Sequence, residues 1–306
     1  MPPNTASIRT LILNKRSNFM LTTISSDILK VTIDTFGAEL HSVKDCNDTE
    51  YLWQADEKVW KRHAPVLFPF ICNTASKKYT VDGKEYALSN HGFARDSEFE
   101  LLYAKESSAE FYLGYSDETL KIYPYKFGLY ANYTLEGNAL KVTYTAENKD
   151  DKPMYFFLGG HPAFRCPVGD DESFTDYYVE FEKNESIARN ENDVVLDNSN
   201  KVSLGHDLFK NDVFMKNKPN SSWVALASKT HDHKVTLSYD KNGCIAVWSS
   251  WFEDREKTNA AEFVCLEPWS SVPVYESGVT ELTEMPDAKK LMPNEKYAFT
   301  FTVRIG

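Results

Sequence analysis

Four short segments of the sequence place ionisable or hydrogen-bonding side chains next to glycine, proline or aromatic residues. Histidine and glutamate are side-chain types that general acid–base catalysis uses near neutral pH, so those in the segments are candidates for proton transfer. None of the segments matches a metal-binding or nucleotide-binding fingerprint. They are 90–93 (Asn-His-Gly-Phe), 159–162 (Gly-Gly-His-Pro), 208–212 (Leu-Phe-Lys-Asn-Asp) and 265–269 (Cys-Leu-Glu-Pro-Trp).

His161 and Glu267 each follow an apolar run. His161 comes after the run 155–158 and the two glycines, where a buried strand emerges and the backbone turns. A structural histidine bonded to a backbone carbonyl is the competing interpretation. Glu267 follows the apolar run 263–266, and burying an unpaired carboxylate costs several kcal/mol. Glu267 therefore needs a partner, either in a catalytic site or in a structural salt bridge.

The other polar candidates carry weaker signals. His91 lies in a glycine-containing turn, where a surface histidine is also common, and Asp212 alone is unremarkable. The aromatic side chains near these segments favour a core position, although some could stack on the apolar face of a sugar ring. These aromatic residues are Phe93, Trp248, Trp251 and Trp269.

Alternating apolar and polar residues predict the strands that must position these side chains. Half-buried strands are indicated over 29–34, 140–146 and 299–305. Asp82-Gly83, Glu136-Gly137-Asn138 and Asn242-Gly243 lie between or beside such runs and predict three antiparallel hairpins. No window shows convincing helical periodicity. We therefore predict an all-β protein with few, short helices.

The domain organisation follows from length and from the continuity of the strand pattern. One domain fits 306 residues, because all-β sandwiches routinely grow large. The polar stretch 183–218 predicts a long functional loop inside that domain, since strand-like patterning continues on both sides. Residues 1–19 predict an N-terminal extension without an export signal, with Met20 as an alternative start, and residues 20–306 predict the single domain.

Charge and cysteine usage exclude several classes of partner. The formal net charge of −11 opposes binding to nucleic acid. The five cysteines are odd in number and form no Cys-x-x-Cys pair, which favours reduced thiols in the cytoplasm and predicts neither a disulfide nor a zinc site. No run of eighteen apolar residues predicts a membrane-spanning helix. Monomer and homodimer both remain open.

The order of the motifs resembles the aldose 1-epimerase (mutarotase) superfamily, specifically its galactose-mutarotase-related branch in bacterial lactose operons. The resemblance covers residues 20–306 and rests on His91 before Gly92, His161 before Pro162, and Glu267 in that order. Supporting marks are the segments 36–40 (Phe-Gly-Ala-Glu-Leu), 64–69 (Ala-Pro-Val-Leu-Phe-Pro) with Trp60 before it, and 79–84 (Tyr-Thr-Val-Asp-Gly-Lys).

The resemblance implies one large antiparallel β-super-sandwich with a sugar cleft on its concave face, and chemistry without a metal or organic cofactor. It implies that His161 is the general acid, Glu267 the general base, and His91 and Asp212 sugar-binding residues. One position departs from the family pattern: Asn73 stands where galactose mutarotases carry a substrate-binding arginine. A neutral amide cannot replace a bidentate cation, so either Arg62 or Arg95 reaches the cleft, or the substrate differs.

The implied reaction interconverts the α- and β-anomers of a hexose. Glu267 would take the proton of the anomeric hydroxyl and His161 would protonate the ring oxygen, with both roles reversed on ring closure. A phosphorylated hexose is the first alternative substrate and would need cations from Arg62, Arg95 or the 77–78 lysine pair, which could equally be a solvated face.

Two further alternatives change the class of protein. A non-catalytic sugar-binding or sensing protein is suggested by the missing arginine. A polysaccharide lyase or glycosidase could share the fold, but hydrolysis normally needs two suitably spaced carboxylates, and Glu267 is the one strong candidate.

Overall fold

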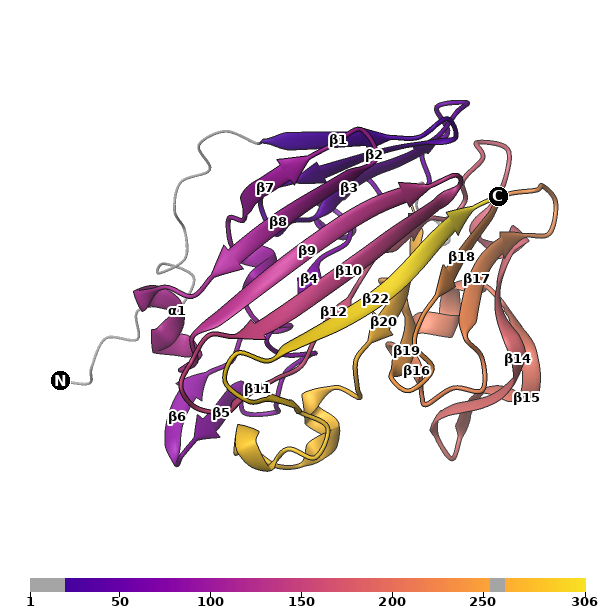
Figure 1. The fold of residues 1–306 in the computed structure, drawn as a ribbon. Helices are drawn as coiled ribbons and strands as arrows, with labels where there is room; N and C mark the ends of the chain where they lie inside the picture. The colour runs from indigo at the N-terminus through magenta and orange to yellow at the C-terminus, as the bar shows by residue number, and fades with distance from the viewer. Residues whose placement is uncertain (1–19, 254–261) are drawn as a thin grey trace.

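The computed structural model describes residues 20–253 and 262–306. The predictions for residues 1–19 lie outside this range. Every strand pair in the described residues is antiparallel, as in the pairing of Leu140 with Val303. The all-β prediction is confirmed, and Figure 1 shows the strands arranged as a broad curved sheet with further strands behind it.

The broad sheet has nine strands, and its central strands alternate between the core and solvent. Along β10 and β22 the buried positions are every second residue, because successive side chains of a strand point to opposite faces. In spatial order the sheet is β15 (Asp193–Ser203), β14 (Tyr177–Asn190), β17 (Trp223–Ser228), β18 (Lys234–Ser238), β22 (Lys296–Ile305), β10 (Ala139–Asn148), β9 (Phe127–Glu136), β8 (Ser108–Gly114) and β7 (Glu100–Ala104).

The second large sheet lies behind the first in Figure 1. Its central strand β20 is buried at every residue, as expected for a strand covered on both faces. The strand order is β16 (Phe214–Asn217), β19 (Cys244–Trp248), β20 (Phe263–Trp269), β12 (Gly159–Gly160) and β4 (Val66–Leu67), with β13 (Ala163–Arg165) also paired to β20.

The remaining strands form smaller sheets. They are β1 (Leu21–Ser25), β2 (Leu29–Asp34) and β3 (Leu40–Asp45) in one sheet, β5 (Lys78–Val81) with β6 (Lys84–Ala87), and β11 (Met154–Phe156) with β21 (Lys289–Leu291).

Helices are short, as predicted. The helix α1 (Asp117–Ile122) begins at Ser116, which forms a capping box with Thr119. Short 3₁₀ helices are η2 (Ala94–Asp96), η3 (Phe174–Asp176), η4 (His206–Phe209), η6 (Val274–Ser277) and η7 (Leu282–Glu284). None of the helices described in the structure is long and apolar enough to cross a membrane.

The two large sheets share a hydrophobic core. A single cluster of buried side chains reaches from Ile24 near the start of the described chain to Ile305 near its end. Gly160 of β12 marks the contact between the sheets, because a Cβ atom built there would lie 2.9 Å from the Phe301 ring on β22. That residues 20–306 form one domain stays a prediction.

Most of the predicted strands and turns are confirmed. The patterns at 29–34, 140–146 and 299–305 lie in β2, β10 and β22. Asp82-Gly83 connects β5 to β6, and the turn at Gly137 connects β9 to β10.

Two local predictions are wrong. Asn242-Gly243 does not close a hairpin, because β18 before it belongs to the nine-stranded sheet and β19 after it to the six-stranded sheet. The polar stretch 183–218 is not one long loop: β14 and β15 form a hairpin there. Because β15 is an edge strand with few buried residues, its composition resembles that of a loop.

Candidate active site

The strand register places His161 directly opposite Glu267. On one side of this position Gly159 of β12 pairs with Trp269, and on the other Ala163 of β13 pairs with Cys265, in the same antiparallel register. His161 lies midway between these pairs, as Glu267 does on β20. Residues opposite one another in such a register have Cβ atoms about 5 Å apart, so the backbone itself brings the two side chains together.

The Gly-Gly pair before His161 allows β12 to lie close against β20. A Cβ atom at Gly159 would lie 2.9 Å from the Trp269 ring and 3.2 Å from the Pro268 carbonyl oxygen. A Cβ atom at Gly160 would lie 2.9 Å from the Phe301 ring of β22 and 3.6 Å from the Tyr144 ring of β10. Larger residues would push β12 away from β20, so the two glycines set the position of the His161 ring.

The His161 and Glu267 side chains form a close, buried contact. Nε2 of His161 lies 3.1 Å from Oε2 of Glu267, and the two side chains are 8% and 2% exposed. The contact is not aligned as a hydrogen bond, and neither Oε2 of Glu267 nor Nδ1 of His161 has another partner. Two buried polar atoms therefore remain available to a ligand. Buried side chains with a purely structural role rarely leave polar atoms without a hydrogen bond.

Burial pushes both members of the pair towards their uncharged forms. It lowers the pKa of His161 to about 3, with the charge of Arg95 as the next cause. Burial raises the pKa of Glu267 well above its ordinary value, and the nearby Trp269 indole offsets only part of this rise. Both shifts favour the neutral pair, in which a single proton lies on the carboxyl group and the imidazole is uncharged.

Aromatic rings enclose His161 on one side. The Trp60 ring stacks on the His161 ring with centroids 5.0 Å apart, and Trp248 meets it edge-on at 5.8 Å. Phe263 of β20 stacks behind Trp60 at 5.3 Å. This aromatic wall, made of Trp60, Trp248 and Phe263, fixes the imidazole orientation and excludes water from it.

His91 belongs to the same site and is not a surface histidine. It is buried, and its ring lies edge-on to the His161 ring with centroids 5.5 Å apart. The Cys72 amide donates to Nδ1 of His91 at 3.1 Å, so the other nitrogen, Nε2, carries the proton. Burial lowers the pKa of His91 well below its ordinary value, which keeps the ring neutral.

The turn around His91 is held by close backbone packing. His91 has a φ of 61°, and Gly92 follows at 73°. A Cβ atom at Gly92 would lie 2.2 Å from the Phe68 carbonyl oxygen, so only glycine fits.

Arg95 brings a cation to the site from η2. Its side chain is 14% exposed, and its Nε lies 3.9 Å from Oδ2 of Asp96 without forming a hydrogen bond. Its charge lowers the pKa of His161 after burial, and that of His91 after burial and the charge of His161. Arg62 pairs more closely with the same carboxylate, at 2.6 Å. Asn73 also has a buried side-chain oxygen without a partner. Of the two arginines that the sequence analysis named as able to reach the cleft, Arg95 has the larger effect on the pKa of His161.

Asp212 lies at the open side of the site. It follows η4 with a φ of 68° and lines a surface cavity of about 270 Å³ together with Lys210 and Trp248. Trp248 joins this cavity to the aromatic wall around His161. The Asp212 charge contributes to the raised pKa of Glu267, after burial and Trp269. All the predicted site residues therefore lie around one region, with Asp212 the most exposed.

Sequence reasoning missed Trp60 and Cys265 as site residues. Cys265 is two residues before Glu267 on β20, and a strand period of two places both on one face. That spacing could have indicated Cys265. Trp60 lies in an irregular segment, where no periodicity indicates its direction.

Comparison with known proteins identifies the family. The sequence model of the aldose 1-epimerase family matches residues 20–278. The chain belongs to the aldose 1-epimerase family. Protein LacX from Lactococcus lactis subsp. lactis is 29% identical over 301 residues, covering 92% of this chain and 98% of LacX. The predicted family and its LacX-related branch are confirmed.

Solved structures of two relatives share the fold of this family member. A galactose mutarotase related enzyme from Lactobacillus acidophilus is 31% identical, with a TM-score of 0.84 over 94% of this chain and 97% of the other. A galactose mutarotase-like protein from Lactobacillus casei is 29% identical, with a TM-score of 0.82 over 94% and 100%. The predicted galactose mutarotase-like sandwich is confirmed.

Proposed function

We propose that this chain is an aldose 1-epimerase, an isomerase that interconverts the α- and β-anomers of a hexose. The observation that carries the proposal is the His161–Glu267 pair: a facing imidazole and carboxyl group, buried, 3.1 Å apart and with unused hydrogen-bonding atoms. Ring opening needs one group that removes a proton and one that supplies it. The pair provides both without a cofactor.

In this proposal, the anomeric hydroxyl donates to Oε2 of Glu267 and gives the carboxylate the hydrogen bond that it lacks. This hydrogen bond favours the ionised carboxylate, so the shared proton moves to His161. Glu267 then takes the hydroxyl proton while His161 protonates the ring oxygen, and the ring opens to the aldehyde. Rotation about the C1–C2 bond and reversal of both transfers close the ring as the other anomer.

The neighbouring residues bind the sugar. Trp60 and Trp248 contact its apolar faces, and His91 donates from its protonated Nε2. Arg95, whose Nε lies 3.9 Å from Asp96 but forms no hydrogen bond, supplies the positive charge that Asn73 does not provide. Asp212 accepts from a hydroxyl group at the open side.

A hexose phosphate is the second candidate substrate. Nε of Arg95 forms no hydrogen bond, although it lies 3.9 Å from Asp96, and Lys210 lines the cavity that Asp212 also lines. These two cations could bind a phosphate group that a free hexose lacks. Lys78, by contrast, pairs with Glu85 at 2.7 Å on an exposed hairpin.

The test follows the optical rotation of freshly dissolved α-glucose and α-galactose, and by coupled assay their 6-phosphates. Wild type, Glu267→Gln and a buffer blank are compared. We expect wild type to accelerate the approach to equilibrium and Glu267→Gln to lose about 10²–10⁴-fold of that rate. Wild type matching the blank on all four sugars would contradict the proposal and favour a sugar-binding protein without catalysis.

Glu172→Gln is the matched control. Glu172 also has a fully buried carboxylate beside a histidine, and its hydrogen bonds and ion pairs in the described residues join it to none of the site residues. Its variant should keep the wild-type rate per folded molecule. A loss of rate equal to that of Glu267→Gln would show that any buried charge change disables the protein, and would remove the support for Glu267 as the base.

A further inference from the structure

Cys265 completes a group of three metal-ligating side chains. Cys265 and Glu267 point to the same face of β20, since they are two residues apart. Ligand atoms of His161, Cys265 and Glu267 all lie within 4.8 Å of one another, and all three side chains are buried. Imidazole nitrogen, thiolate sulfur and carboxylate oxygen are the three ligand types that Zn²⁺ takes in proteins.

The spacing suits a tetrahedral ion. Ligands that bind zinc at about 2.0–2.3 Å lie roughly 3.4 Å from one another, and Nε2 of His161 is already 3.1 Å from Oε2 of Glu267. That oxygen, on a side chain that is 2% exposed, has no hydrogen-bond partner to lose. We propose that His161, Cys265 and Glu267 bind Zn²⁺ as an inhibitory ion, which blocks the acid–base pair.

The charge balance favours this exchange. Without the ion, the thiol carries one proton and the His161–Glu267 pair holds another. Zn²⁺ displaces both protons to solvent and adds two positive charges, so the net charge of the buried site does not change.

Cobalt(II) spectroscopy tests the site without relying on catalysis. We expect Co²⁺ to bind the wild-type protein with the visible bands of a tetrahedral ion and a thiolate-to-cobalt charge-transfer band, and Zn²⁺ to displace it. Because two protons are released, the affinity should rise by up to about 100-fold per pH unit near neutral pH. In the mutarotation assay, half-inhibition by Zn²⁺ should match its dissociation constant.

Cys265→Ser should abolish the charge-transfer band and weaken Zn²⁺ binding by at least about tenfold, because a hydroxyl group is a poor zinc ligand. Cys265→Ala is a second variant in case the serine form does not fold. Cys46→Ser, at an exposed cysteine, and His231→Asn, at a surface histidine cluster, are controls that should leave the band unchanged.

A band absent from wild type, or one that persists in folded Cys265 variants, would overturn the proposal. Binding through Cys265 in a protein without mutarotase activity would leave the zinc site standing and reject the proposed function. Mutarotation that Zn²⁺ does not slow at saturating occupancy would reject the inhibitory role.

Discussion

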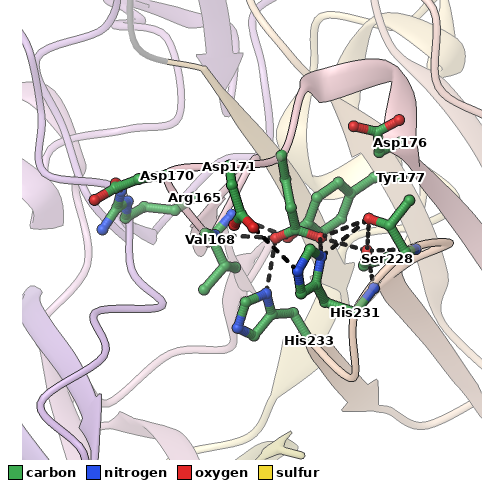
Figure 2. Close-up of polar contacts among 12 residues, drawn as sticks. Arg165, Val168, Asp170, Asp171, Asp176, Tyr177, Ser228, His231 and His233 are labelled. Carbon is green, nitrogen blue, oxygen red and sulfur yellow. Dashed lines mark hydrogen bonds and ion pairs between the residues drawn. The ribbon is translucent and has the colours of Figure 1, made fainter.

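Two buried histidine–carboxylate contacts in this protein have opposite hydrogen-bonding environments. In the site, the carboxylate oxygen of Glu267 nearest His161 has no hydrogen-bond partner. In the loop before η3, the Glu172 carboxylate accepts hydrogen bonds from Tyr177, His233 and Ser228 (Figure 2). The Gly169 amide donates a further hydrogen bond.

The two carboxyl groups consequently differ in charge. Burial would raise the pKa of Glu172, but the hydrogen bonds from Ser228, Tyr177 and His233 outweigh it and lower the pKa to about 2. Burial dominates at Glu267 and raises its pKa. Both carboxylates are buried next to a histidine, so the number of donors decides which one stays ionised. Glu172 ties the β13–β14 connection to the turn after β17, whereas Glu267 keeps an oxygen without a hydrogen bond.

The largest expected difference between the two pairs is in catalysis. Glu267→Gln should lower kcat/KM for mutarotation by about 10²–10⁴-fold, because the amide cannot accept the hydroxyl proton. Glu172→Gln should change it less than about threefold, because no reacting atom touches that side chain. Polarimetry on both variants, normalised to folded protein, measures the two values of kcat/KM. Equal losses in the two variants would contradict the expected difference.

Stability should show the reverse order. Glu172→Gln replaces an acceptor-only carboxylate by an amide whose NH₂ group faces donors, and should lower the free energy of unfolding by roughly 2–4 kcal/mol. Glu267→Gln should lower the free energy of unfolding by less than about 1 kcal/mol, or raise it. The reason is that the substitution removes a buried carboxyl group that lacks a full set of hydrogen bonds. Urea denaturation at pH 7 gives both values. A larger stability loss in Glu267→Gln contradicts the comparison.

Acid should destabilise the protein through Glu172. Its folded-state pKa of about 2 lies below the ordinary value of 4.5, so its stabilisation is fully present above pH 4.5 and is lost as the pH falls through about 2. Between these limits the urea midpoint of wild type should fall more steeply than that of Glu172→Gln. Parallel curves for the two proteins would show that Glu172 does not carry this dependence.

Activity should respond differently to the same acidification. The proposed active form holds one proton on the His161–Glu267 pair, and the second proton binds only near the lowered His161 pKa of about 3. Therefore kcat/KM should not decrease as the pH falls from 6 to 4.5, provided that the protein is folded. An ordinary carboxylate base would lose half of its ionised form at pH 4.5. A half-loss at or above that pH would refute the shared-proton scheme.

The smallest effect is expected from removing one donor at Glu172. Tyr177→Phe deletes the hydroxyl group that donates to Oε2 at 2.5 Å, and should cost about 1 kcal/mol of stability because the other donors remain. It should also raise the pKa of Glu172, so that the loss of stability in acid begins at a higher pH. Thermal and urea unfolding against pH measure both effects. If the loss of stability in acid begins at the same pH as in wild type, Tyr177 contributes packing alone.

The fold could be predicted to the extent that its strands have one buried and one solvated face. Alternation in β2, β10 and β22 reflects this arrangement, and glycine turns indicated the β5–β6 and β9–β10 hairpins. The edge strand β15 has little to bury, so its composition did not distinguish it from a loop.

The site was less accessible to sequence reasoning. His161 and Glu267 could be proposed because each follows an apolar run, but their contact depends on a register between distant strands that no local pattern encodes. Trp60 stacks on His161 from an irregular segment, and the charge of Arg95 acts on His161 from the three-residue helix η2. In both places the side-chain direction depends on tertiary packing.

The placement of Glu267 on β20 bears on how relatives of this protein diverge in evolution. Glu267 lies on a strand that is buried at every residue and paired on both sides, so substitutions around it disturb the core. Asp212 and Lys210 lie on the exposed turn after η4. Substitutions in that turn therefore cost little stability. Under the proposed function, selection can change substrate preference in the turn while it preserves proton transfer on the strand.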